Sequence, residues 1–116
     1  MRKIIAILCL SLLFLSCKKS KNEEITACGV VNPIQNLTWL NQKYKLFTGG
    51  PKLNSIVLYE YNGSQIIQVN QSVSSKMYDV YNCNGEPLMF DDANGLNKYL
   101  AGRKKVAVIY GTFQLD

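Results

Sequence analysis

The chain contains no histidine among its 116 residues. Histidine is the most frequent general acid or base in enzymes, it activates serine and cysteine nucleophiles, and it is a common zinc ligand. Its absence excludes His-based acid–base catalysis, Ser-His and Cys-His nucleophiles, and most metal sites. We also find no nucleotide-binding or other catalytic motif, so we expect a non-enzymatic protein without a cofactor or metal.

A hydrophobic run long enough to span a bilayer is also missing. The longest run, residues 4–15, is almost unbroken over 12 residues, whereas a spanning helix needs about 20. The run follows the positive pair Arg2 and Lys3. A positive segment followed by a short apolar one is typical of a secretory signal peptide.

The signal segment lacks an A-x-A-like cleavage site and ends in "FLSC" at residues 14–17. This tetrapeptide resembles the bacterial lipobox, in which cleavage occurs before the cysteine and its thiol is acylated. We therefore predict a lipoprotein signal peptide at residues 1–16 and lipid attachment at Cys17. The alternative is an ordinary signal peptide cleaved nearby, with Cys17 incidental.

Residues 17–25 continue from the lipidated cysteine into the polar stretch "KKSKNEE". Such a stretch cannot bury enough apolar surface to order itself. We interpret it as a flexible tether between the membrane lipid and a single domain at residues 26–116. Lys18 stands where Asp signals inner-membrane retention in enterobacteria, so we expect a lipid anchor in the outer membrane, on the periplasmic side or at the cell surface.

The domain also lacks a strong excess of positive charge. Of 13 basic and 8 acidic residues, the signal segment holds two basic ones, and the tether holds three basic and two acidic ones. This leaves 8 against 6, a net charge of +2. The only basic cluster, "GRKK" at residues 102–105, stands at an expected helix end, where cations favour the helix dipole. We therefore expect no nucleic-acid partner.

Two cysteines remain for the domain once Cys9 leaves with the signal peptide and Cys17 carries the lipid. In an oxidising compartment an even pair favours a disulfide, here between Cys28 and Cys83. The alternatives are two buried free thiols or a metal pair, and two cysteines without histidine make a poor zinc site.

The remaining pattern predicts elements in the order α-β-β-β-β-α-β. Asn32 and Pro33 are suited to begin a helix, and apolar residues then recur every three or four positions as far as Phe47. Asn-Gly pairs at residues 62–63 and 84–85 indicate two hairpins. The fold class is α+β: two layers, with a four- to five-stranded, mainly antiparallel sheet and helices on one face. The strands are expected at residues 55–61, 64–71, 77–83, 86–90 and 104–113, the last of fully buried type, and the second helix within residues 91–102.

Three features, a cysteine just before "NPIQNLTWL", a tyrosine-rich hairpin and "VYNCNG", resemble a family of small Bacteroidota lipoproteins. That family shares a Cys, an N-P-x-x-x-L-x-W-L helix start and a Y-x-C-x-G turn. The likeness runs from Cys28 to Tyr110. It implies an envelope location and a structural pairing of Cys28 with Cys83. The family has no assigned activity, so the resemblance implies no mechanism.

Two sets of strand residues are candidates for function. Glu60 and Asp79 are acids within predicted strands, where a facing pair of carboxylates can hydrolyse glycosides. The simpler interpretation is that both face solvent. Tyr59 and Tyr61 share one face of a strand and form a binding surface if helices cover only the other face. Otherwise such rings stabilise the sheet as cross-strand pairs.

From these observations we expect a membrane-anchored envelope lipoprotein whose domain binds a protein or glycan partner. The alternative is a structural or accessory subunit of an envelope complex. A carboxylate-dependent hydrolase ranks third.

Overall fold

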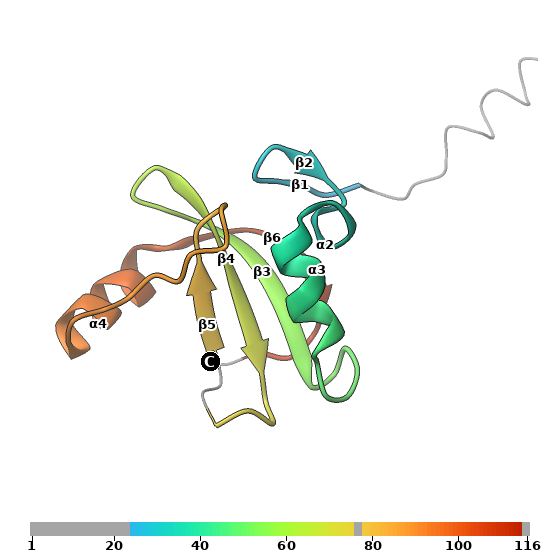
Figure 1. Ribbon diagram of the computed structural model, residues 1–116. Helices are drawn as coiled ribbons and strands as arrows, with labels where there is room; N and C mark the ends of the chain where they lie inside the picture. The colour runs from blue at the N-terminus through green and yellow to red at the C-terminus, as the bar shows by residue number, and fades with distance from the viewer. Residues whose placement is uncertain (1–23, 76–77, 115–116) are drawn as a thin grey trace, which may run out of the picture.

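The computed structural model describes residues 24–75 and 78–114. The predicted signal peptide, Cys17 and most of the tether lie outside the described residues. An antiparallel sheet of four strands in the order β5-β4-β3-β6 forms the centre of the described part (Figure 1). The α+β class and the antiparallel sheet are therefore confirmed. The strands are β3 (Asn54–Tyr61), β4 (Ser64–Gln71), β5 (Tyr78–Tyr81) and β6 (Lys104–Gly111).

A small hairpin and three helices accompany this sheet. The hairpin precedes everything else and pairs β1 (Thr26–Ala27) with β2 (Val30–Val31). The helices are α2 (Pro33–Asn36), α3 (Thr38–Lys45) and α4 (Ala93–Gly102).

The single helix expected after Pro33 is divided into α2 and α3. Leu37 between them is extended, with φ −103° and ψ 110°. Both Ile34 and Leu37 pack against the core around Leu40. Because tertiary packing outweighs propensity in short helices, this contact outweighs helix continuity. Asn32 precedes α2, but its φ is 53° and its side chain makes no capping bond.

The two Asn-Gly turns have different outcomes. Asn62 and Gly63 both have positive φ and join β3 to β4 in full register, which confirms the first hairpin. The second pair forms a turn, but the strand expected at residues 86–90 is reduced to one bridge between Tyr81 and Pro87. Hydrogen bonds flank this bridge on both sides, from the Asn82 N–H to the Glu86 carbonyl and from the Leu88 N–H to the Val80 carbonyl, so Pro87 stands where a backbone N–H would point away from β5.

The helices lie on both faces of the sheet, so the prediction that they share one face is wrong. Ile56 and Leu58 of β3 pack with Leu40 of α3. The alternate residues Val57 and Tyr59 pack with Tyr99 of α4. Figure 1 shows α3 and α4 on opposite sides of the strands. Three layers result, and they explain why β3 is apolar at consecutive positions, as strands buried on both faces are.

The C-terminal strand β6 is an edge strand, which corrects the prediction of a fully buried one. Val106 is 53 % exposed and Val108 is 43 % exposed. Its register with β3 shifts twice, so that Val106 and Ile109 are extra residues without a partner. Such bulges twist an edge and hinder pairing with another chain.

Candidate binding groove

The disulfide joins the first hairpin to the turn after β5. The Sγ atoms of Cys28 and Cys83 are bonded, their Cα atoms lie 5.4 Å apart, and 55 positions separate them in sequence. Cys28 stands in the β1–β2 turn with φ 55°. A closure of this length stabilises a fold by about 4 kcal/mol in the chain-entropy model. The predicted pair is confirmed, and it fixes the segment that leads into α2.

Trp39 packs against the same turn after β5. Its indole Nε1 donates to the Cys83 carbonyl at 3.1 Å, and its ring lies 5.2 Å from that of Tyr81. A Cβ on Gly85 would stand 2.6 Å from the Trp39 ring, and the φ of Gly85 is 85°. Glycine is therefore required in this turn. Trp39 is part of the packing and not a platform for a ligand.

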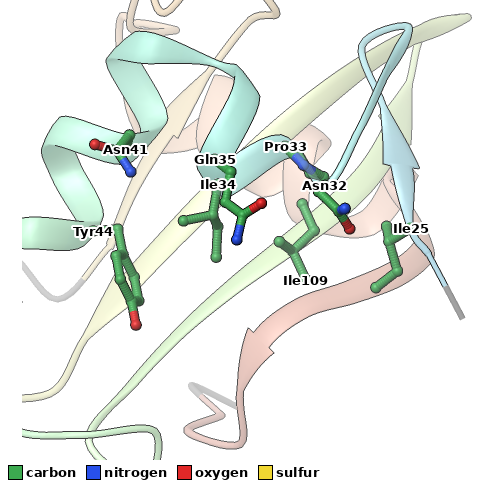
Figure 2. A pocket seen from close by; sticks show the side chains of 8 residues that line it. All are labelled: Ile25, Asn32, Pro33, Ile34, Gln35, Asn41, Tyr44 and Ile109. Atoms are coloured by element: carbon green, nitrogen blue, oxygen red, sulfur yellow. The ribbon is translucent and has the colours of Figure 1, made fainter. Parts of the chain in front are cut away.

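A groove opens between the helices of this face and the edge strand (Figure 2). The bulge in β6 places Ile109 on the same face as its neighbour Tyr110, and both pack toward α3. Figure 2 shows Gln35 and Tyr44 reaching from the helices toward β6. The volume is about 540 Å³, within the range of roughly 300–1,000 Å³ typical of ligand sites. The lining residues are Ile25, Asn32, Pro33, Ile34, Gln35, Asn41, Tyr44 and Ile109.

None of the described residues that line this groove carries a charge. Asn32, Gln35 and Asn41 contribute side-chain amides, and these make no hydrogen bond to another described residue. Each amide offers one acceptor and two donor hydrogens. The other described lining residues are apolar apart from the Tyr44 hydroxyl. Such a surface suits a ligand that combines neutral polar groups with apolar ones.

Ile25 was assigned to the tether from sequence, but it belongs to the groove. Its backbone carbonyl accepts a hydrogen bond from the backbone N–H of Asn32 at 3.0 Å. The folded part therefore begins at least one residue before position 26.

The tyrosines expected at a binding surface are covered instead. Tyr59 is 8 % exposed, and the half-buried Tyr61 meets the ring of Tyr99 edge-on at 5.2 Å. The condition for a platform was a face without helices, and α4 occupies that face. These rings therefore stabilise the fold by packing between the sheet and α4, and not as the cross-strand aromatic pairs of the alternative interpretation.

Glu60 and Asp79 do not form a carboxylate pair. Glu60 pairs across the sheet with Gln65, whereas Asp79 pairs with Val69, four residues further along β4. Because β4 lies between them, their Cα atoms are about 16 Å apart by strand geometry. Glycosidase carboxylates are separated by roughly 5–10 Å.

The groove could not be found from the sequence, because its lining comes from three distant segments. Gln35 and Asn41 stand off the apolar stripe of the predicted helix, and such positions usually face solvent. The bulge that redirects Ile109 has no marker in "VAVIYG".

Comparison of the chain with models of protein families, with curated proteins and with solved structures gives no match. Among residues 24–75 and 78–114, no helix is long and apolar enough to cross a bilayer.

Proposed function

We propose that the protein is a lipid-anchored domain of the bacterial envelope that binds a neutral ligand through the groove. The anchor is Cys17, supported by the lipobox-like "FLSC" that ends a short apolar run. Lipidation at such a cysteine would supply several acyl chains, and two or more acyl chains hold a protein stably at a membrane. We place the anchor in the outer membrane because Lys18, and not the Asp that signals inner-membrane retention in enterobacteria, follows the acylated residue.

One observation carries the binding function: three side-chain amides, without hydrogen bonds to other described residues, line a groove of about 540 Å³ whose described lining residues are all uncharged. A protein segment or a neutral glycan fits this chemistry. Both present amide or hydroxyl groups beside apolar surface. A non-enzymatic role agrees with the separation of Glu60 from Asp79.

The test uses the processed lipoprotein in zwitterionic detergent and two probes, isolated cell-wall glycan and a phage-displayed library of random peptides. Asn41→Asp places a charge in the groove without changing side-chain volume. Lys98→Ala, on the exposed side of α4, is the control. We expect one probe to be retained by the parent and the control, and to bind Asn41→Asp about tenfold more weakly. Retention of neither probe, or equal retention by all three proteins, would contradict the binding function.

A second candidate function is that of an accessory subunit in an envelope complex. A more apolar groove of about 440 Å³ lies between β5, the segment after the second turn, and α4, and it supports this role. Met89 on its rim is 77 % exposed. Exposed methionine beside apolar surface is typical of protein-binding sites. Stoichiometric recovery of one protein from native membranes, lost in Met89→Lys and kept in Asn41→Asp, would favour this alternative.

A further inference from the structure

The α4 face of the sheet contains a continuous chain of buried hydrogen bonds. The Tyr99 hydroxyl and the Arg103 guanidinium both donate to Gln68 Oε1, each at 2.6 Å. Gln68 Nε2 donates to Asn70 Oδ1 at 2.8 Å, and Asn70 Nδ2 donates to Ser55 Oγ at 2.9 Å. Gln68, Asn70 and Ser55 are at most 3 % exposed. The chain therefore fixes the side chains on which Arg103 rests.

Arg103 is held in one orientation. Its guanidinium carbon lies 4.4 Å from the centre of the Tyr59 ring and 5.3 Å from that of Tyr99. Gln68 takes one N–H of the five that a guanidinium carries. The guanidinium also forms a hydrogen bond with the Tyr99 hydroxyl, and no further hydrogen bond within the described residues uses its remaining N–H groups. A planar cation that two aromatic rings hold in place, and that keeps unused N–H donors, can bind the oxygens of a carboxylate or phosphate.

A small cleft adjoins this guanidinium. Its volume is about 40 Å³, whereas a single water needs roughly 10–15 Å³. Lys105 also lines it, from the β6 position that pairs with Tyr59. Among the described residues that line it there are two cations and no carboxylate. The lining residues are Val57, Tyr59, Gln68, Asn70, Arg103, Lys105, Phe113 and Gln114.

We propose that this cleft is an oxyanion site, in which Arg103 and Lys105 hold a single carboxylate or phosphate group. The cleft accommodates one such group and not a larger molecule, so the rest of a ligand would extend into solvent beyond Lys105. The basic segment "GRKK" thus binds an anion in addition to interacting favourably with the helix dipole. The site lies on the sheet face opposite the neutral groove and does not depend on it.

The oxyanion has two sources that the chemistry alone does not separate: a free anion, or the phosphate of a lipid headgroup. The experiment follows the backbone amides of Arg103 and Lys105 by NMR in the ¹⁵N-labelled processed lipoprotein in zwitterionic detergent. Inorganic phosphate and acetate are titrated against chloride at equal ionic strength. A parallel arm adds vesicles of phosphatidylglycerol or of phosphatidylcholine.

We expect saturable shifts with phosphate or acetate and none with chloride. Arg103→Gln and Lys105→Gln should weaken binding about tenfold, while Lys98→Gln, which removes an exposed charge of α4, leaves it unchanged. Lys105 is exposed, so its variant carries the test if Arg103→Gln does not fold. Saturation by phosphatidylglycerol vesicles alone assigns the site to a headgroup. Absence of saturation in every arm, or equal shifts with chloride, would overturn the proposal.

Discussion

The two faces of the sheet are built from the same strands but by different chemistry. The face under α3 is apolar, with Leu40, Ile56 and Ile67 completely buried. The face under α4 combines Tyr99 with a chain of amides and one arginine. On the first face a disulfide links the β1–β2 hairpin to the turn after β5, whereas no disulfide involves α4. Both faces bury apolar side chains, but the first face adds chain closure by the disulfide, whereas the second adds a chain of buried hydrogen bonds.

This difference predicts different responses to mutation. An apolar core loses stability in proportion to the volume removed. A buried polar chain tolerates loss of one donor but not loss of a shared acceptor, because the remaining partners are then buried without hydrogen bonds. The predictions below compare the two faces, from the largest expected effect to the smallest.

The disulfide should contribute most. Replacing Cys28 and Cys83 together by Ser should lower the free energy of unfolding by about 4 kcal/mol, because the unfolded chain regains the conformational entropy that closing a loop of 55 positions removes. Urea unfolding of the processed protein measures this loss. Reduction of the parent protein should reproduce it. A loss below roughly 1 kcal/mol in both experiments would mean that packing alone holds this corner.

Truncating the apolar face should have the next largest effect. Leu40 is 0 % exposed, whereas Leu100 on α4 is 40 % exposed. Leu40→Ala should cost about 3 kcal/mol, since it opens a cavity that the sheet cannot fill. Leu100→Ala is the matched control and should cost less than about 1 kcal/mol. Equal losses, measured as urea midpoints, would show that the core does not lie under α3.

The shared acceptor should dominate the polar face. Gln68→Leu leaves the Tyr99 hydroxyl, the Arg103 guanidinium and the Asn70 amide without their partner. We expect a loss of about 2 kcal/mol. The control Gln42→Leu changes an exposed glutamine of α3 and should be nearly neutral. A neutral Gln68→Leu variant would mean that solvent satisfies these groups.

Tyr99→Phe should have the smallest effect at neutral pH, about 1 kcal/mol, because Arg103 still bonds to Gln68. The variant should differ from the parent mainly in how its stability changes at alkaline pH. Burial removes the phenolate from water and raises the pKa of Tyr99 from 10.0 to about 12. The folded protein therefore keeps this proton where the unfolded chain loses it, and stability falls as pH rises from 10 to 12.

In the Tyr99→Phe variant this alkaline loss should be smaller. It should not vanish, because desolvation and the neighbouring Tyr44 also raise the pKa of Tyr110. Urea midpoints across this pH range, with parent and variant compared, measure the difference. Identical pH profiles would show that the Tyr99 hydroxyl is not buried against Gln68.

Several local features of the fold were predictable because short-range chemistry determines them. The Asn62–Gly63 turn supplies two residues that accept positive φ, and Asp92 caps α4 by accepting from the Gly95 amide at 2.9 Å. The Cys28–Cys83 pair followed from counting the cysteines left to the domain.

Features set by tertiary contacts were not predictable. Gln68 and Asn70 alternate with Ile67 and Val69, a pattern that usually indicates a solvent face. They are buried because α4 returns across them and brings Tyr99 and Arg103. No local pattern specifies on which face a helix packs, so both the second covered face and the groove beside Ile109 were missed.

The claim that a ligand uses the groove face is tested most directly by photo-crosslinking in the cells that make the protein. Benzoylphenylalanine replaces Gln35 in the groove or Lys98 on α4, one at a time in the full chain. We predict an adduct, identified by mass spectrometry, from position 35 but not from position 98, and its loss when Asn41→Asp is added. An adduct of equal yield at both positions, or one that Asn41→Asp leaves unchanged, would contradict the account.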